Sequence, residues 1–251
     1  MLAEQRQQYV LEQLAKTGAL AISDLVRELG VSRETVRRDL NTLAARGLLL
    51  MTHGGALAAD RSEPDWTLRE NVNAVGKRAI GVRAAELVPD GASVIIDYGT
   101  TTRAVAQALL SKHRLRIYTN DWQIARLLGR HHDNRVTLLG GELQDNEDAV
   151  QGWDAINQIS QYHADFAFIG VGGVTEDGGI TDFNRAAAEL RARMLLCANV
   201  SAVVADHTKF GRVTPVRIRH FEAARYLISD AAPHKSMLAQ LRARGPELLI
   251  A

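Results

Sequence analysis

The chain has 251 residues, 46% hydrophobic and 24% charged, which are the proportions of an ordinary globular protein. This length is long for one compact domain and suits two. The single cysteine, Cys197, excludes an internal disulfide framework. The formal net charge of +1 excludes a strong overall attraction to nucleic acid, so any such attraction must come from local placement of basic residues. No hydrophobic run approaches the ~20 residues that span a bilayer, and no signal peptide opens the chain, so we expect a cytoplasmic protein with no membrane partner.

The first elements are predicted to be three short helices. Two of them cover Glu4–Thr17 and Ser23–Leu29, and a glycine follows each. Ser32 caps the third, whose buried stripe contains Val36 and Leu40 at helical spacing. A turn of about four residues separates the second helix from the third, as in a helix-turn-helix, in which the later helix enters the DNA major groove.

A small β-wing is predicted after the third helix. The run Leu48–Thr52 is too apolar for a loop and too short for a helix, and His53 with the next two glycines forms a tight turn. The sequence therefore predicts a winged helix-turn-helix DNA-binding domain over residues 1–57.

The third helix has a polar face opposite its buried stripe. At about 100° per residue, Arg38 points almost directly away from the stripe, with Thr35 and Arg37 on either side. Guanidinium and hydroxyl groups are donors that meet phosphates and guanine edges. An ordinary solvated helix also accounts for surface arginines, and the first sixty residues hold seven basic and seven acidic side chains. The predicted DNA-binding residues are Ser32, Arg33, Thr35, Arg37, Arg38 and His53.

Residues 58–73 lose periodicity, contain a proline and are predicted to be a linker. From residue 74 to 251, short apolar strands alternate with amphipathic helices, which predicts an α/β domain with a mostly parallel sheet covered on both faces. Strands are predicted at 92–97, 115–119, 135–139, 165–169, 201–205, 226–229 and 248–250. Helices are predicted at 76–87, 102–110, 121–128, 153–162, 186–198 and 235–244.

Ligands of an open parallel sheet bind at the carboxyl ends of its strands. Gly99 and the three threonines after it connect a strand to a helix, and their backbone N–H groups and hydroxyls suit a phosphate. A turn glycine with a threonine cap explains this stretch equally well. Lys209 adds a positive charge near another strand end, although a surface lysine is the simpler interpretation. The candidate ligand residues at the strand ends are Asp97, Gly99, Thr100, Thr101, Thr102, Asn120, Gly140, Gly141, Gly170, Gly172, Gly173 and Lys209.

Several of these motifs carry a resemblance to a known family. The run Val31–Leu40, followed by His53–Ala56, resembles the N-terminal signature of DeoR-family transcriptional repressors. The strand-end motifs resemble the DeoR-type sensor domain, which is similar in fold to ribose-5-phosphate isomerase and CoA-transferase domains. The resemblance implies a repressor of a carbohydrate or polyol catabolic operon, working as a homodimer or homotetramer. It also implies release from operator DNA by a phosphorylated sugar or polyol, and the blocks Leu115–Asn120 and Lys209–Arg212 suggest glycerol 3-phosphate as one candidate.

One loop departs from the family pattern. Members usually carry acidic residues after the position of Gly179, whereas Asn184–Ala188 has none, which leaves Asp182 as the candidate effector residue of this loop. The competing hypothesis is a sugar-phosphate isomerase with an accessory DNA-binding domain. An isomerase needs a positioned acid/base pair, so the missing acids favour a regulator that is not an enzyme.

No cofactor or metal is predicted. The run His131–Asp133 lacks the spaced partner residues of a metal site and is more simply explained as a solvated loop.

Overall fold

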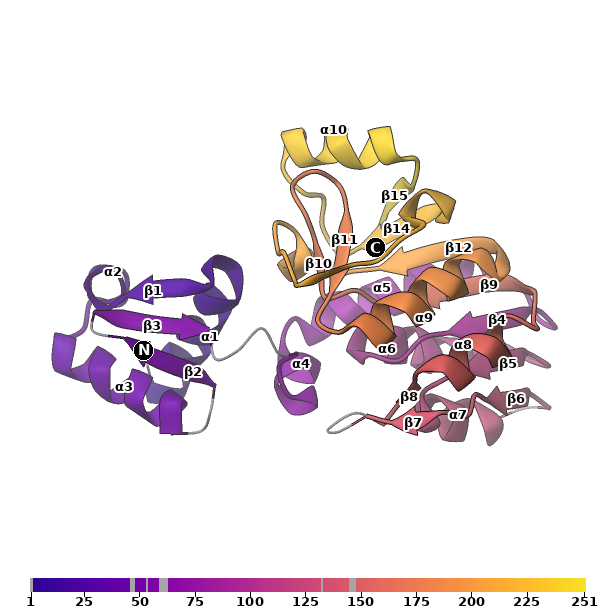
Figure 1. The fold of residues 1–251 in the computed structure, drawn as a ribbon, viewed down its shortest axis with the longest axis horizontal. Coiled ribbons are helices and arrows are strands. Elements are labelled where there is room, and N and C mark those ends of the chain that lie inside the picture. The colour runs from indigo at the N-terminus through magenta and orange to yellow at the C-terminus, as the bar shows by residue number, and fades with distance from the viewer. Residues whose placement is uncertain (1, 46–47, 53, 59–62, 132, 145–147) are drawn as a thin grey trace. The chain divides into compact units, whose positions relative to one another are not determined.

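The computed structural model describes residues 2–45, 48–52, 54–58, 63–131, 133–144 and 148–251 (Figure 1). The chain forms two compact units, Met1–Pro64 and Asp65–Ala251. His53, assigned above to the wing turn and to the DNA-binding face, lies outside the described residues.

The N-terminal unit has the predicted helices and wing. It contains α1 (Ala3–Thr17), α2 (Ile22–Leu29), α3 (Arg33–Ala45), β2 (Leu49–Thr52) and β3 (Gly55–Ala58). A further strand, β1 (Ala19–Ala21), pairs antiparallel with β3 and was not predicted, because three residues are too few to show a period. Leu25, Val36 and Leu40 lie in the core of this unit.

A buried ion pair connects the first and third helices. Arg6 Nε lies 2.7 Å from Asp39 Oδ2, and only 5% of Asp39 is exposed. A carboxylate this deeply buried is tolerated only when it is paired. The pair therefore fixes α3 against α1.

The C-terminal unit is built on one large sheet. Among the described residues its strands are β4 (Ser93–Ile96), β5 (Arg116–Thr119), β6 (Arg135–Leu138), β9 (Ala164–Ile169), β12 (Ala198–Val204), β14 (Tyr226–Ser229) and β15 (Glu247–Ile250). Their order is β15-β14-β12-β9-β4-β5-β6, and every neighbouring pair is parallel. The predicted parallel sheet is confirmed.

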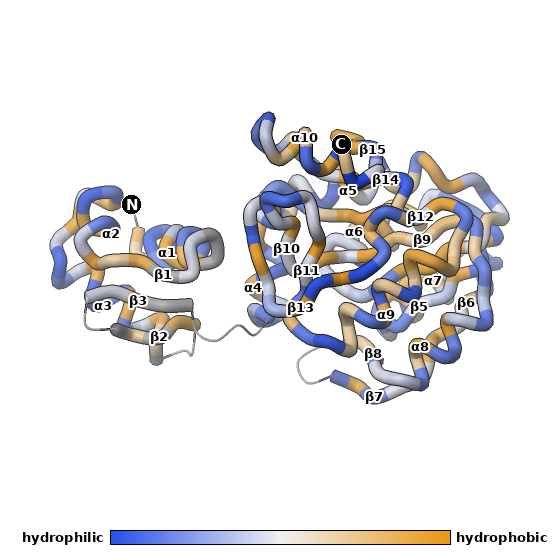
Figure 2. The backbone as a smooth tube through the Cα atoms, turned by 45° about the horizontal axis from the view of Figure 1, so that its top comes forward, coloured by the Kyte–Doolittle hydropathy of each residue, from blue (hydrophilic) through white to orange (hydrophobic). Residues whose placement is uncertain are grey.

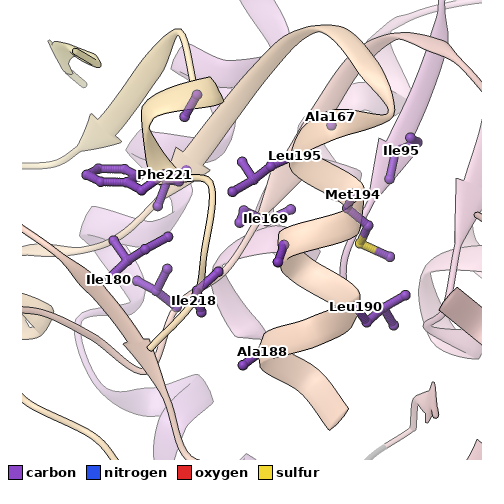
Figure 3. Close-up of a cluster of buried hydrophobic side chains, with 14 of the residues drawn as sticks. Ile95, Ala167, Ile169, Ile180, Ala188, Leu190, Met194, Leu195, Ile218 and Phe221 are labelled. Carbon is purple, nitrogen blue, oxygen red and sulfur yellow. The ribbon is translucent and has the colours of Figure 1, made fainter. Parts of the chain in front are cut away.

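Helices cover both faces of the large sheet (Figure 1). One layer consists of α5 (Ala74–Glu86), α6 (Thr100–Ala108) and α7 (Trp122–Gly129), and the other of α8 (Trp153–Ile159), α9 (Arg185–Leu196) and α10 (Lys235–Arg244). Side chains alternate between the two cores along a strand, so that Val94 and Ile96 pack with the first layer. Ile95 packs with Leu190 and Met194 of α9 (Figure 3). The hydropathy colouring marks the interior strands as hydrophobic (Figure 2).

The structure contains short strands that the sequence did not predict. β7 (Glu142–Leu143) pairs with β8 (Val150–Gln151), and a small sheet joins β10 (Gly173–Val174), β11 (Ile180–Asp182) and β13 (Val216–Arg217). Each has only two or three residues, too few for an alternating pattern. Three short 3₁₀ helices, η1 (Leu109–Ser111), η2 (His207–Lys209) and η3 (Phe221–Ala223), also occur in the described part of the chain.

The second half of the predicted linker is a helix. α4 (Trp66–Asn71) belongs to the C-terminal unit, so residues 66–71 are not linker. The indole ring of Trp66 lies between two guanidinium groups, with Arg69 at 5.3 Å and Arg103 of α6 at 5.4 Å from the ring centre. This tertiary contact stabilises a segment whose six residues are too short for a clear helical pattern.

No helix in the described ranges combines the length and the apolar character needed to cross a membrane.

Asp121 caps α7 from a buried position. Its Oδ1 accepts hydrogen bonds from the backbone N–H groups of Gln123 at 2.8 Å and Ile124 at 3.0 Å. Burial outweighs these bonds and raises the pKa of the Asp121 carboxyl from 3.8 to about 6.

Replacing Asp121 with asparagine is expected to change the pH dependence of stability. The raised pKa means that the folded state binds more protons than the unfolded state between pH 3.8 and about 6, so the wild type loses stability as the pH rises through this window. Asparagine keeps the capping oxygen and does not titrate. Urea unfolding from pH 4 to 8 is expected to show Asp121→Asn gaining about 3 kcal/mol relative to wild type. Parallel pH profiles would contradict the buried, titrating carboxyl.

Candidate functional site

The exposed face of α3 carries the predicted DNA-binding side chains. Arg33, Arg37 and Arg38 are exposed, whereas Val36 is buried on the opposite side of the helix. Ser32 Oγ accepts from the backbone N–H of Thr35 at 3.2 Å, which confirms the predicted cap. The same hydroxyl lies 2.9 Å from Thr35 Oγ1, so these two hydroxyls hydrogen-bond to each other. The three arginines therefore provide the charge of this face.

The second candidate site lies where strands β4, β5, β9 and β12 of the large sheet end. These strands are consecutive in the sheet and parallel, so the loops after them meet at one edge. We call this the carboxyl edge of the sheet.

The helix that follows β4 begins without a side-chain cap. Gly99 has φ +133°, a conformation that L side chains rarely adopt, and no described side chain accepts from the first turn of α6. By contrast, Asp121 caps α7 and Asn184 caps α9. The first-turn N–H groups of α6 thus suit an anion.

The three threonines of this turn are not equivalent. Thr102 is fully buried, and its Oγ1 donates to the carbonyl oxygen of Gly99 at 2.9 Å, so this hydroxyl closes the turn. Thr101 is 7% exposed and Thr100 is half-buried. The structure therefore leaves Thr100 as the threonine best exposed to a ligand.

A buried ion network lies at the same edge. Arg191 of α9 pairs with Asp97, directly after β4, through Nε and Oδ2 at 2.6 Å, and with Asp182 of β11 through Nη1. Its guanidinium carbon is 4.5 Å from the centre of the Tyr98 ring. Asp97 and Asp182 are fully buried, and Arg191 is 3% exposed. Two of the predicted site residues, Asp97 and Asp182, are thus brought together by a residue that was not predicted.

This network contains two carboxyl groups for one guanidinium. Burial raises the pKa of Asp97, although the Arg191 guanidinium and the backbone N–H of Gly170 oppose the shift. Asp97 Oδ2 accepts from Gly170 at 3.1 Å, whereas Oδ1 has no hydrogen-bond partner among the described residues. The carboxylates suit hydroxyl donors better than a second anion.

The side chain of Asn120 hydrogen-bonds to two backbone segments. Its Oδ1 accepts from the backbone N–H of Tyr98 at 3.1 Å, and its Nδ2 donates to the carbonyl of Val150 at 3.0 Å. These bonds connect β4, β5 and β8. Asn120 therefore shapes the edge, and its amide is already engaged by protein groups.

The candidate glycines allow close backbone packing. A Cβ at position 141 would lie 2.6 Å from the carbonyl oxygen of Gln151, and one at position 172 would lie 3.1 Å from Asp182 Cα. A Cβ at position 173 would collide with the carbonyl of Arg212. Gly140 donates its N–H to Gln158 Oε1 at 2.9 Å. These contacts explain the glycines by packing, without a ligand.

Lys209 lies in η2, which follows β12 two strands away from β4. A different lysine, Lys77 of α5, is 4% exposed and was not predicted as a site residue. Its Nζ donates to the carbonyl of Arg69. Burial lowers the pKa of Lys77, and the nearby charge of Asp206 opposes this shift. Lys77 therefore places a buried cation near the end of β12.

The sequence gives only a weak indication of Arg191, the member of the ion network that was not predicted. Arg191 falls between Leu190 and Ala192, which are both buried, so it is a charge within an apolar stretch of α9. Such a position predicts a buried ion pair but not its partners. The run His131–Asp133 includes a residue outside the described set, and no cluster of three potential metal-ligating side chains occurs in the described part.

Comparison with known proteins identifies both units. A family model described as the DeoR-like helix-turn-helix domain matches residues 6–62, and one described as the DeoR C terminal sensor domain matches residues 72–231. The chain is similar to the glycerol-3-phosphate regulon repressor of Escherichia coli (strain K12), with 35% identity over 96% of each chain. It is 30% identical to the HTH-type transcriptional repressor GlcR of Bacillus subtilis (strain 168), over 100% of this chain and 97% of that protein.

The solved structures that match are more distant. Ribose 5-phosphate isomerase A from Methanocaldococcus jannaschii is 17% identical over 55% of each chain, with a TM-score of 0.40. The full-length relatives above are named as repressors, which supports a regulator rather than an enzyme. From its two family domains and these relatives, the chain belongs to the DeoR family of helix-turn-helix transcriptional regulators.

Proposed function

We propose that this repressor binds operator DNA through the exposed arginines of α3 and leaves it when a phosphorylated sugar or polyol binds at the carboxyl edge of the large sheet. The proposal rests on one observation, which is that hydrogen-bond donors and buried carboxylates lie at the same edge of the large sheet. The uncapped first turn of α6 offers N–H donors, and the Asp97–Arg191–Asp182 network offers buried carboxylates.

The two groups suit the two ends of one ligand. A phosphate is stabilised by the first-turn N–H groups and the positive end of the helix dipole, and Thr100 adds a hydroxyl donor. Carboxylates accept from the hydroxyls of a sugar or polyol and disfavour a second phosphate. A polyol or sugar monophosphate meets both requirements. Glycerol 3-phosphate is the first candidate, because it appears in the name of the 35% identical relative.

Binding to an operator with two half-sites requires two copies of α3. Helix-turn-helix proteins bind paired half-sites as symmetric dimers, so we infer a homodimer or homotetramer in the cytoplasm. Residues 59–65, between β3 and α4 in the sequence, connect each DNA-binding unit to its sensor and would transmit a change in half-site spacing.

An isomerase is the weaker alternative. Its acid and base would have to be Asp97 and Asp182, and Arg191 already pairs with both carboxylates. The relatives that match nearly the whole chain are named as repressors, which favours the regulator.

Arg38→Ala is expected to weaken operator binding without unfolding the protein. Loss of one base or phosphate contact corresponds to about 1–3 kcal/mol, or roughly 5- to 150-fold in affinity. Arg78→Ala removes the same charge from the exposed side of α5 and serves as the matched control. Binding is measured by fluorescence anisotropy at several salt concentrations. Equal affinities of Arg38→Ala and wild type at matched salt would show that Arg38 does not face the operator.

The phosphate should be essential for release. A phosphorylated effector is expected to weaken operator binding about 5- to 150-fold, as a coupling of ~1–3 kcal/mol between sites requires, while its unphosphorylated parent has no effect. Thr100→Val and Lys209→Ala are expected to bind operator normally but need about fivefold and about tenfold more effector, respectively, for half-release.

The matched control is Thr137→Val, which makes the same substitution in β6. Release of both site variants at the wild-type effector concentration would place the sensor pocket elsewhere.

A further inference from the structure

The side chain of Gln151 is buried without a hydrogen-bond partner. Only 1% of the residue is exposed, and neither Nε2 nor Oε1 has a partner among the described residues. Nearly all buried polar groups of native proteins are hydrogen-bonded, so an exception calls for a physical explanation. An amide with both ends unsatisfied destabilises the ligand-free fold and is well suited to a ligand.

Backbone contacts place Gln151 at the carboxyl edge of the large sheet. The backbone N–H of Val150 donates to the carbonyl of Asn120 at 2.9 Å, and Asn120 Nδ2 returns a bond to the carbonyl of Val150. β8 therefore lies against the end of β5. Ala149 packs with Tyr98 and Ala187 in a small buried cluster. Residues two apart in an extended chain share a face, so Gln151 is on the same face of the chain as Ala149.

The ion network is connected to the same cluster through α9, which contacts β8. Ala187 and Arg191 are one turn apart on α9 and lie on the same side of the helix. Arg191 stacks on the ring of Tyr98, and it pairs with Asp97, whose Oδ1 is also without a hydrogen-bond partner among the described residues. Gln151 and Asp97, two buried side chains with unused hydrogen-bonding capacity, are therefore within two residues of members of the same small cluster.

We propose that Gln151 is a specificity-determining residue of the effector site, hydrogen-bonding the hydroxyl groups of the ligand. The inference rests on the proposed function, because it takes the phosphate end of that ligand to lie at α6. A hydroxyl both donates and accepts, so two hydroxyls can satisfy Nε2, Oε1 and Asp97 Oδ1 together. The site then selects a monophosphate that carries at least two free hydroxyls.

The proposal predicts opposite effects on stability and binding. Gln151→Met keeps the length of the side chain and removes both polar atoms, so the ligand-free variant is expected to melt about 2 °C or more above wild type. The effector concentration for half-release from operator is expected to rise at least tenfold. Gln107→Met, on an exposed position of α6, is the matched control and should change neither quantity.

The probes are glycerol 3-phosphate, ribose 5-phosphate, glucose 6-phosphate and inorganic phosphate, tested by thermal shift and operator release on the full chain. Inorganic phosphate should bind wild type and Gln151→Met equally, because it has no hydroxyl tail to reach Gln151.

Two results would overturn this inference and leave the proposed function intact. One is an ester that releases wild type and Gln151→Met from operator at the same concentration. The other is a ligand-free Gln151→Met that melts below ligand-free wild type. If wild type responds to none of the three esters at millimolar concentration, the proposed function fails and this inference fails with it.

Discussion

A guanidinium held between two carboxylates is the interaction on which the C-terminal unit depends. Arg191 lies on α9, Asp97 directly follows β4, and Asp182 belongs to the small sheet. Moving any one of these charges out of water alone would cost several kcal/mol, so each tolerates burial only because the others are present. The network therefore fixes the position of α9 and of the small sheet against the edge where strand-end loops converge.

The same edge of the sheet combines two different electrostatic environments. The α6 end presents the partial positive charge of unsatisfied N–H groups. The network end has two carboxyl groups for one guanidinium. A ligand bound across both must carry an anionic end and a hydrogen-bond-donating end, so charge distribution alone orients it. The charge distribution of the edge therefore favours one orientation of the ligand, independently of the ligand's shape.

Sequence periodicity predicted the repeating core of the fold but not the contacts between distant residues. Strands such as β4 and β5 are short apolar runs bounded by turn residues, so they were found within a few residues. β8 and β11 have two and three residues and carry no period. Asp97 and Asp182 were recognised as polar groups at strand ends, but their common partner is nine residues beyond Asp182 and inside a helix. Asn120 was expected to face a ligand and instead connects backbone segments, which only the tertiary structure reveals.

The strand order of the large sheet also has a consequence for how the chain is made. β4 is flanked by β9, which follows it by some seventy residues, and β9 is flanked by β12, which ends at Val204. Met1–Pro64 is by contrast a compact unit formed by one short, continuous segment. Synthesis from the N-terminus thus delivers the helix-turn-helix well before the sensor sheet can close. A chain that ends between Pro64 and Val204 therefore keeps α3 within a complete first unit but lacks strands of the sensor sheet.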